Sequence, residues 1–461
     1  MHRNTIRLFF FFLFLSNSVY SQNIFRSVCQ GNIGRVDSLI NESQATINQQ
    51  DQYGNTPLHF AVYCKKVEVL KRLLERKASV EAMDNHGRTP LFYASMRNDL
   101  AGLDQLLAHQ ANPNVVDVYG DAPIHQAVLY GHLDIARKLI ESGAIVNMLN
   151  KRGSTPLRIA VREENEELVQ MLLTLGADQD DLNLPVLKGK YFGQEKPGST
   201  PVMFAPGFIS TEMPQLDAVF HPNGKEFYYS IETSEWAMIM CTKLVNDHWT
   251  RPAPATFSGD YREVDLFITK DGSKLFYCSY RPVHEEDSIK DNPDLWMVER
   301  AGDDWGSPIH LGKDVNSDQE EWYPTVSDQG TLYLSVGQER EGTSNICFSK
   351  MVNGQYGKPI FLPDAVNSDV YDYDPFIAQD ESYLMFASKR PGGLGDSDLY
   401  ISYRNEDGSW SKAKNLGENV NSPSADFTPI ISPDGKYFFF TSWRAGTGDI
   451  YWVEAKTIFE N

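Results

Sequence analysis

The N-terminal third of the chain repeats itself every 33 residues. Four segments, GNTPLHFAVY, GRTPLFYASM, GDAPIHQAVL and GSTPLRIAVR, place Pro57, Pro90, Pro123 and Pro156 at that interval. A glycine three residues before each proline keeps the same step. A fixed period of this length is typical of solenoids, in which each unit buries its apolar face only against its neighbours. The sequence therefore predicts a stack of small, similar units.

Each unit contains its own signal for the start of a helix. Thr56, Thr89 and Thr155 stand before a proline, and a threonine hydroxyl can accept a hydrogen bond from the first free N–H groups of the helix. Proline fits the first helical position because its missing N–H would be unpaired there anyway. The third unit has Ala122 instead of threonine, so we expect its helix to be less well capped.

These motifs resemble the ankyrin repeat, which we assign to residues 22–178 as an all-α solenoid of about five units with hairpin loops. A half-matching first unit starts at Ser27. The resemblance implies that His59 and His125, in the slots TPLH and APIH, make structural hydrogen bonds. It also implies a binding surface made by the hairpin tips and the exposed positions of each first helix.

Aromatic side chains on an exposed concave face are typical of binding hot spots. An alternative stays open, in which several of them pack between repeats. The candidate binding residues are Tyr53, Phe60, Tyr63, His86, Tyr93, Met96, Tyr119, Gln126, Tyr130 and Arg152.

A second repeat begins after residue 211 and ends with SPDGKYFFFTSWRAGTGDIYW. Five units of about 50 residues combine a tight-turn dipeptide, such as Asn223-Gly224 or Asp271-Gly272, with flanking strands of alternating apolar residues. These units resemble the TolB-like, WD-related propeller repeat of exported bacterial envelope proteins. The resemblance implies an all-β propeller of five blades over residues 198–457, which makes the chain multidomain.

The last propeller unit lacks an outer strand of its own. The segment STPVMFAPG, before the first unit, has Pro201 where other outer strands have a proline. We expect this segment to complete the last blade and close the ring, because closure removes an exposed sheet edge. Residues 179–197 are then expected to be a linker.

One position of the propeller repeat is acidic in four of the five units. The innermost strands of a propeller line its axis, so these side chains could converge at one mouth. Their equivalence favours a structural role, in which they accept hydrogen bonds or pair with Arg281, Arg390 and Arg444. These axis acids are Glu263, Glu321, Asp372 and Asp426.

Two alternatives for the axis acids stay open: a carboxylate pair that hydrolyses or cleaves a glycan or peptide, and a site for a cation or other small ligand. We predict no catalytic residue, no metal ligand and no cofactor. No G-x-S-x-G motif is present, and the glycine loop RPGGLGDSD joins two strands rather than opening a helix.

The first 21 residues resemble a secretory signal peptide. Two arginines precede the apolar run LFFFFLFL, which is too short to cross a membrane, and small residues stand near Ser21. We therefore expect a secreted or periplasmic protein without a transmembrane segment. The five cysteines follow no disulfide or zinc pattern.

The formal net charge is −20, and most of the excess acid lies in the second repeat region. Such a surface repels phosphate backbones, which disfavours nucleic acid as a partner. We interpret the chain as an exported, non-enzymatic binding or scaffold protein with another protein as its partner. The alternative is a propeller enzyme acting through the axis acids.

Overall fold

The structure is a computed structural model, and it describes residues 22–182, 187–233, 236–284, 289–290, 292–338 and 343–459. The expected signal peptide, residues 1–21, lies outside these ranges. The chain divides into two compact units, residues 1–185 and 186–461. Each unit is described by itself below.

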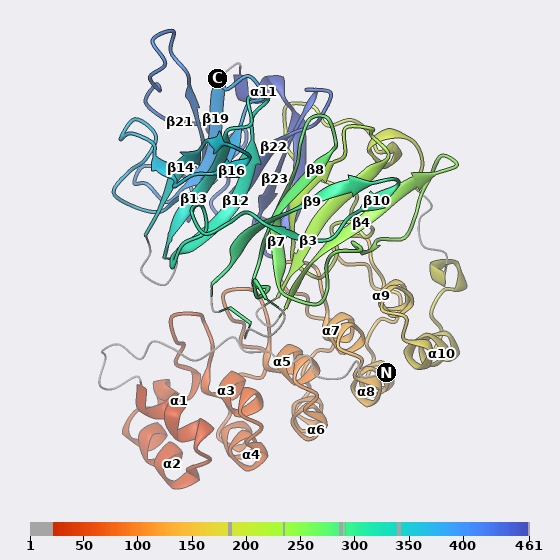
Figure 1. Ribbon diagram of the computed structural model, residues 1–461. Helices are drawn as coiled ribbons and strands as arrows, with labels where there is room; N and C mark the ends of the chain where they lie inside the picture. The colour runs from red at the N-terminus through yellow and green to blue at the C-terminus, as the bar shows by residue number, and fades with distance from the viewer. Residues whose placement is uncertain are drawn as a thin grey trace. The chain divides into compact units, whose positions relative to one another are not determined.

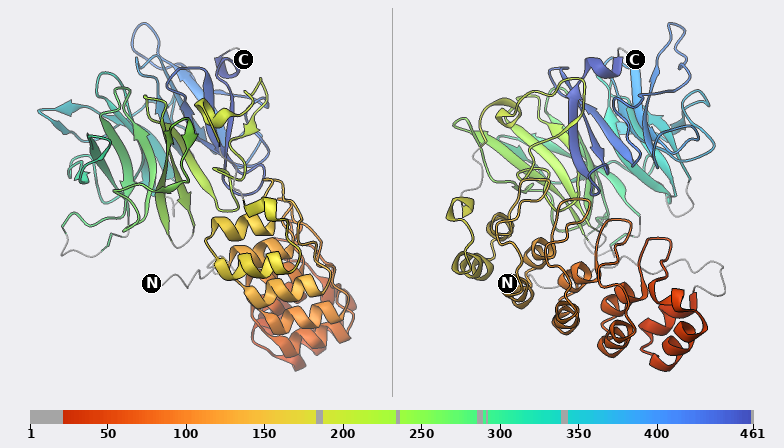
Figure 2. Two further views of the ribbon diagram at one scale, coloured as in Figure 1. Left: turned by 90° about the vertical axis from the view of Figure 1, so that its right-hand side faces the viewer. Right: turned by 180° about the vertical axis from the view of Figure 1, so that it is seen from behind.

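The first unit is the expected solenoid, built from five pairs of antiparallel helices (Figure 1). The left-hand view of Figure 2 shows the helices stacked in layers. The helices are α1 (Gln22–Cys29), α2 (Ile33–Glu42), α3 (Pro57–Tyr63), α4 (Val67–Glu75), α5 (Pro90–Met96), α6 (Leu100–Ala108), α7 (Pro123–Leu129), α8 (Leu133–Glu141), α9 (Pro156–Arg162) and α10 (Glu166–Thr174).

Buried histidines bind the start of one helix to the following repeat. His59 Nδ1 accepts the backbone N–H of Thr56 at 3.0 Å, and its Nε2 lies 3.0 Å from the carbonyl oxygen of Arg88. Burial lowers the pKa of His59, so the ring is neutral and can accept on one nitrogen while it donates on the other. His125 repeats the arrangement with the N–H of Ala122. The structural role implied for these histidines is present.

A disulfide joins the first two helix pairs. Cys29, at the end of α1, is bonded to Cys64, which follows α3, across 35 residues of sequence. The remaining cysteines of the described chain, Cys241, Cys278 and Cys347, are free. No helix among the described residues is long and apolar enough to span a membrane.

The second unit is a five-bladed propeller, as expected. Each blade is an antiparallel sheet that starts with its innermost strand. The first blade contains β2 (Gln215–Phe220), β3 (Glu226–Glu232), β4 (Ala237–Val245), β5 (His248–Trp249) and β6 (Ala253–Pro254); the second contains β7 (Glu263–Ile268), β8 (Lys274–Ser279), β9 (Asp294–Ala301), β10 (Asp304–Trp305) and β11 (Ile309–His310).

The remaining strands make the other three blades. The third contains β12 (Glu320–Val326), β13 (Leu332–Gln338), β14 (Thr343–Ser349) and β17 (Ile360–Phe361), with the hairpin β15 (Met351–Val352) and β16 (Gln355–Tyr356); the fourth contains β18 (Asp372–Ile377), β19 (Tyr383–Ser388), β20 (Asp398–Tyr403) and β21 (Lys414–Asn415); the fifth contains β22 (Asp426–Ile431), β23 (Tyr437–Ser442), β24 (Asp449–Glu454) and β1 (Val202–Met203).

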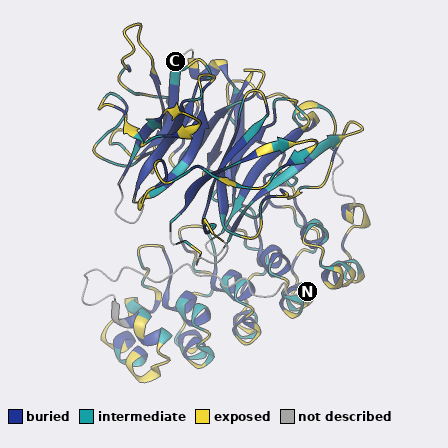
Figure 3. Ribbon diagram, viewed as in Figure 1, coloured by how far each residue is buried: buried dark blue, intermediate teal, exposed yellow. Residues whose placement is uncertain are grey.

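Strand β1 closes the ring. Val202 pairs with Trp452 and Met203 with Tyr451, so the segment before the first blade is the outer strand of the last one. This pairing is the closure that the sequence predicts. The strands around the axis are almost wholly buried, as the dark blue ribbons of Figure 3 show, and every residue of the innermost strands β2 and β7 is buried.

The expected linker, residues 179–197, is in large part not a linker. Phe192 is 1% exposed within the propeller core and stacks on Trp249 with ring centroids 4.1 Å apart. The neighbouring Tyr191 contacts Phe220 of the first blade and Tyr437 of the fifth. The linker was predicted from the polar residues of this segment. Its position in the structure follows instead from two adjacent aromatic rings, which pack between the first and last blades.

Candidate functional site

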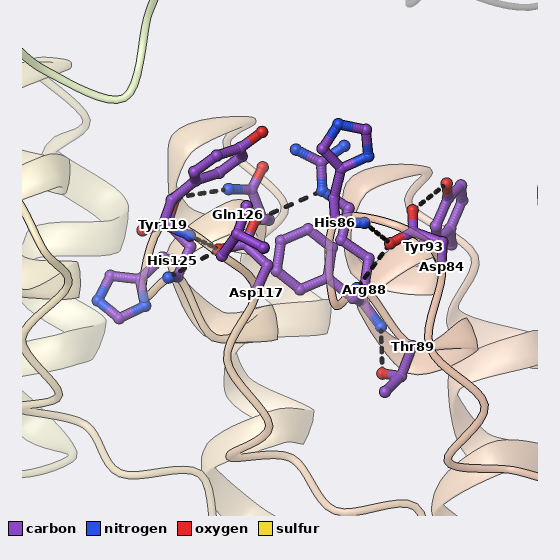
Figure 4. A network of polar contacts seen from close by, with 12 residues as sticks. Asp84, His86, Arg88, Thr89, Tyr93, Asp117, Tyr119, His125 and Gln126 are labelled. Atoms are coloured by element: carbon purple, nitrogen blue, oxygen red, sulfur yellow. Dashed lines mark hydrogen bonds and ion pairs between the residues drawn. The ribbon is translucent and has the colours of Figure 1, made fainter. Parts of the chain in front are cut away.

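The hairpin loops of the ankyrin unit repeat one hydrogen-bonded turn. In the loop before α5, Asp84 Oδ1 accepts the backbone N–H groups of His86 and Arg88, both at 2.8 Å (Figure 4). Asp51, Asp117 and Asn150 hold the other loops in the same way. These hydrogen bonds hold the conformation of each hairpin tip within its own loop.

Adjacent hairpins are also bonded to each other through the backbone. The N–H of Asn85 donates to the carbonyl oxygen of Tyr53 at 2.9 Å, and the N–H of Val118 donates to that of His86 at 2.9 Å. Lys151 and Tyr119 make the same bond one repeat further along, at 3.0 Å. The row of tips is therefore one continuous, ordered edge.

Tyr119 does not lie exposed at its tip as expected. It is 3% exposed, with the guanidinium groups of Arg88 and Arg152 at 5.4 and 5.8 Å from its ring centroid. Arg152 is itself 2% exposed. Both cation–π contacts stabilise the ring in its buried position. Both residues belong to the interior of the hairpin row rather than to its surface.

A buried carboxylate accompanies this cluster. Asp117 Oδ2 lies 3.4 Å from Arg88 Nε. Burial and the nearby carboxylate of Asp121 raise the pKa of Asp117 to about 6, although the charge of Arg88 acts in the opposite direction. The carboxylate of Asp117 is therefore expected to bind a proton in mildly acidic solution.

The other predicted surface residues divide by exposure. Tyr53 and His86 are exposed, whereas Gln126 is 7% exposed and donates to Asp121 Oδ2 at 3.1 Å. Tyr93 is half-buried, and its hydroxyl lies 2.9 Å from Asp84 Oδ2 and 3.0 Å from Asn55 Oδ1. The remaining half-buried candidates are Phe60, Tyr63, Met96 and Tyr130.

The sequence reading overlooked a row of exposed apolar residues on the same edge. Met83, Val116 and Leu149 occupy one repeat position, directly before the loop residue Asp84 and its equivalents, and are 46%, 43% and 60% exposed. The first full repeat has Gln50 there. Their spacing of 33 residues is visible in the sequence, but they lie outside the repeated glycine and proline motifs.

In the propeller, three of the four axis acids make the expected ion pairs. Glu263 accepts from Arg281 Nη2 at 3.1 Å, and the equivalent bonds join Asp372 to Arg390 at 2.6 Å and Asp426 to Arg444 at 2.8 Å. The same carboxylates accept bonds from the loop that leads into the strand; Asp372 Oδ2, for example, accepts the N–H and hydroxyl of Ser368. All are 0% exposed.

Glu321 differs from the other three. Its Oε1 accepts the N–H and hydroxyl of Ser317, while Oε2 has no hydrogen-bond partner among the described residues. Burial raises the pKa of Glu321 to about 7. In the other three blades the arginine follows two residues after the partner of the axis acid in the next strand, and the strand pairing puts Gln338 at this position here.

A second set of buried acids, two residues further along, joins the blades at the axis. Asp217 accepts the backbone N–H of Asp265 in the next blade at 3.0 Å, and Asp374 accepts that of Thr428 at 3.2 Å. The five residues at this position all have positive φ, at a β-bulge in the inner strand. They are Asp217 (58°), Asp265 (56°), Tyr323 (51°), Asp374 (52°) and Thr428 (49°).

Tyr323 fills the axis at this level. Its ring is 2% exposed, and its hydroxyl, on the third blade, donates to the carbonyl oxygen of Pro429 on the fifth at 3.4 Å. Among the described residues, no group of three or more His, Cys, Asp or Glu side chains is arranged to hold a metal ion. Three of the four axis acids are thus bound to an arginine and to the loop before their strand.

Comparison with known proteins bears on the N-terminal unit. The family model described as ankyrin repeats (3 copies) matches residues 24–117 and 91–183. An ankyrin repeat protein of Fowlpox virus (strain NVSL) is 64% identical over 36 residues, which is 8% of this chain and 7% of the viral protein. The N-terminal unit is therefore a set of ankyrin repeats, followed in the same chain by a five-bladed β-propeller.

Proposed function

We propose that the protein is an exported, non-enzymatic binding protein that recognises another protein along the hairpin edge of its ankyrin unit. Ankyrin repeats together with a propeller support a protein-interaction role. The observation that carries the proposal is the row of Met83, Val116 and Leu149, three large apolar side chains at one position of consecutive repeats. Exposed apolar side chains gathered on one edge are typical of an interaction surface.

The edge is also rigid enough for recognition. Backbone hydrogen bonds join successive tips, and the buried ring of Tyr119 is packed against Arg88 beneath them. A preorganised surface loses little conformational entropy when a partner binds. Tyr53 and His86, both exposed, extend the same edge with aromatic groups.

The contacts of the axis acids support the non-enzymatic part of the proposal. A glycosidase needs two carboxyl groups with different roles on either side of an open site. Here Asp372 and Asp426 have equivalent ion pairs to arginine, and Tyr323 occupies the axis. Carboxylates bound in this way stabilise blades.

The disulfide supports export. Cys29 and Cys64 are bonded, and disulfides persist in oxidising compartments such as the periplasm or the extracellular space. A secreted or periplasmic location also agrees with the apolar N-terminal run in the sequence.

Affinity capture from the envelope fraction with the mature protein tests this function. The test variant carries Met83→Ser, Val116→Ser and Leu149→Ser. The matched control carries Ile33→Ser and Leu100→Ser, which are exposed apolar residues at the starts of α2 and α6, 37% and 40% exposed. We expect one protein, identified by mass spectrometry, to be recovered by the wild type and the control and lost with the test variant. Equal recovery by all three would contradict the proposed edge.

A further inference from the structure

Two of the seams between propeller blades contain an arginine and tryptophan pair at equivalent positions. Between the first and second blades, the guanidinium of Arg300 lies 5.1 Å from the ring centroid of Trp305 and makes two bonds to Glu226, at 2.8 and 3.0 Å. Trp305 Nε1 donates to the hydroxyl of Tyr228 at 2.9 Å, and that hydroxyl donates to Glu226 at 2.6 Å. Arg300 and Trp305 of the second blade are thus hydrogen-bonded to Glu226 and Tyr228 of the first.

The seam between the third and fourth blades has the same pair but lacks the acid. Arg404 lies 5.0 Å from the ring centroid of Trp410, in the positions of Arg300 and Trp305. The residue equivalent to Glu226 is Thr331, which cannot pair with arginine. The described residues of the third blade therefore offer Arg404 no carboxylate.

Glu381, from the fourth blade itself, is the carboxylate near Arg404. Glu381 Oε2 lies 3.6 Å from Arg404 Nη1, which is longer than either bond of Arg300. Glu381 has φ 60° in a turn, a conformation that an L-residue adopts only at a cost. The other four blades have glycine at this turn position: Gly224, Gly272, Gly330 and Gly435.

As a result, a pocket of about 570 Å³ opens between the third and fourth blades, within the range typical of small-molecule sites. Its lining includes four aromatic residues, Tyr333, Phe348, Phe361 and Trp410. Phe361 is 54% exposed, although it is a large apolar residue on a strand. Such a wall suits a flat or branched apolar group.

The charged groups of the pocket are mainly donors. Among the described residues, none accepts a hydrogen bond from Trp410 Nε1 or pairs with the exposed ammonium of Lys350, and Arg404 lies over the Trp410 ring, interacts with the Tyr333 hydroxyl and has a long contact to Glu381. Glu381 is the one carboxylate among the described lining residues, and it already accepts bonds from Ser327 at 2.8 Å and Tyr333 at 3.3 Å. The pocket is thus a cationic, donor-rich spot on an acidic unit.

We propose that this pocket binds an apolar carboxylate, with the apolar body between the aromatic walls and the carboxylate on Lys350, Arg404 and Trp410 Nε1. Charge-assisted bonds from guanidinium and ammonium groups suit a carboxylate best. This chemistry is shared by a free aromatic acid and by the C-terminal residue of a peptide. The site is separate from the ankyrin edge and does not depend on it.

Isothermal titration of the full mature chain with two probes tests the proposal: 3-phenylpropionate, and an N-acetylated tripeptide that ends in phenylalanine. The C-terminal amide of each probe is its control. We expect the acids to bind at least about 10-fold more tightly than the amides, because a hydrogen bond to a charged group contributes about 1.5 to 3 kcal/mol. The stronger of the two acids identifies the source of the ligand. Equal binding of acid and amide, or no binding of either acid, would overturn the proposal.

A double variant that copies the residues of the first seam into the seam between the third and fourth blades tests the pocket most directly. Thr331→Glu with Glu381→Gly gives the third seam the residues of the first, so Arg404 should pair across it and the pocket should close. We expect this variant to lose carboxylate binding at unchanged melting temperature. Lys350→Ala should weaken binding about 10-fold, whereas Lys358→Ala, an exposed lysine outside the pocket, should have no effect. Retained binding in both the transplant and Lys350→Ala would contradict the assignment.

Discussion

The carboxylate of Asp265, in the second blade of the propeller, accepts the backbone N–H of Tyr323 in the third blade at 3.2 Å. Asp217 makes the same bond to the N–H of Asp265 itself. The blades are therefore joined at the axis through buried acids. Burial raises the pKa of Asp217 to about 7, and burial together with the neighbouring carboxylates of Asp217 and Asp374 raises the pKa of Asp265.

These raised pKa values predict a pH dependence of propeller stability. Both carboxyl groups bind protons in the folded state at pH values where the unfolded chain has released them, so the free energy of unfolding falls as pH rises from about 4 through 7. Each kcal/mol lost should lower the melting temperature by about 2 to 4 °C. Calorimetry at pH 5.5 and pH 8 should show the propeller transition lower at pH 8. The variant Asp217→Asn should reduce the difference; an unchanged pH dependence would show that the raised pKa of Asp217 does not contribute to it.

Reduction of the disulfide should destabilise the ankyrin unit alone. Cys29 and Cys64 close a loop of 35 residues, and removal of such a crosslink costs about 2 to 4 kcal/mol. The double variant Cys29→Ser and Cys64→Ser should lower the ankyrin melting transition and leave the propeller transition in place. If the wild type melts identically with and without reductant, the disulfide is absent in solution.

Phe192 should matter to the propeller rather than to the junction between units. Its ring is buried against Trp249, and truncation of a buried phenylalanine to alanine costs about 3 to 5 kcal/mol. Phe192→Ala should lower the propeller transition, while Lys196→Ala, an exposed change in the same segment, should not. Equal melting of the two variants would show that the segment is a linker after all.

The axis acids should respond unequally to amide substitution. Asp372→Asn and Asp426→Asn each leave a half-buried arginine without its carboxylate, so each should cost about 1.5 to 3 kcal/mol. Glu321→Gln should cost less, because Glu321 has one unpaired oxygen and a pKa of about 7. Melting with and without calcium, beside a substrate screen, measures this order. Calcium-dependent melting or substrate turnover abolished by one variant would instead indicate a metal or catalytic site.

The repeat architecture is predictable from sequence because residues recur at a fixed place in the units, such as Pro57 at the start of a helix and Gly224 in the hairpin turn of four of the five blades. The closing strand at Val202 is also predictable, because the sequence shows that the last unit lacks an outer strand of its own. Burial of side chains within a repeat is not predictable in this way. Tyr119 stands at a tip position, but Arg88 and Arg152 lie on either side of it only once the units have stacked.

The pocket between the third and fourth propeller blades was also beyond sequence reasoning. It depends on Thr331 in one blade and Glu381 in the next, which are 50 residues apart and look ordinary alone. The packing of the segment around Phe192 was also not predicted. The segment is mostly polar, but the rings of Tyr191 and Phe192 pack against the propeller core and fix its position.

The binding edge of the ankyrin unit is tested most directly by the dissociation constant of the purified partner. Measured by titration calorimetry, the variant with serine at Met83, Val116 and Leu149 should bind about 30-fold or more weakly than the wild type, because hot-spot truncations cost 2 kcal/mol or more. The control with serine at Ile33 and Leu100 should bind like the wild type. Unchanged affinity in the triple variant, with both melting transitions intact, would contradict the account.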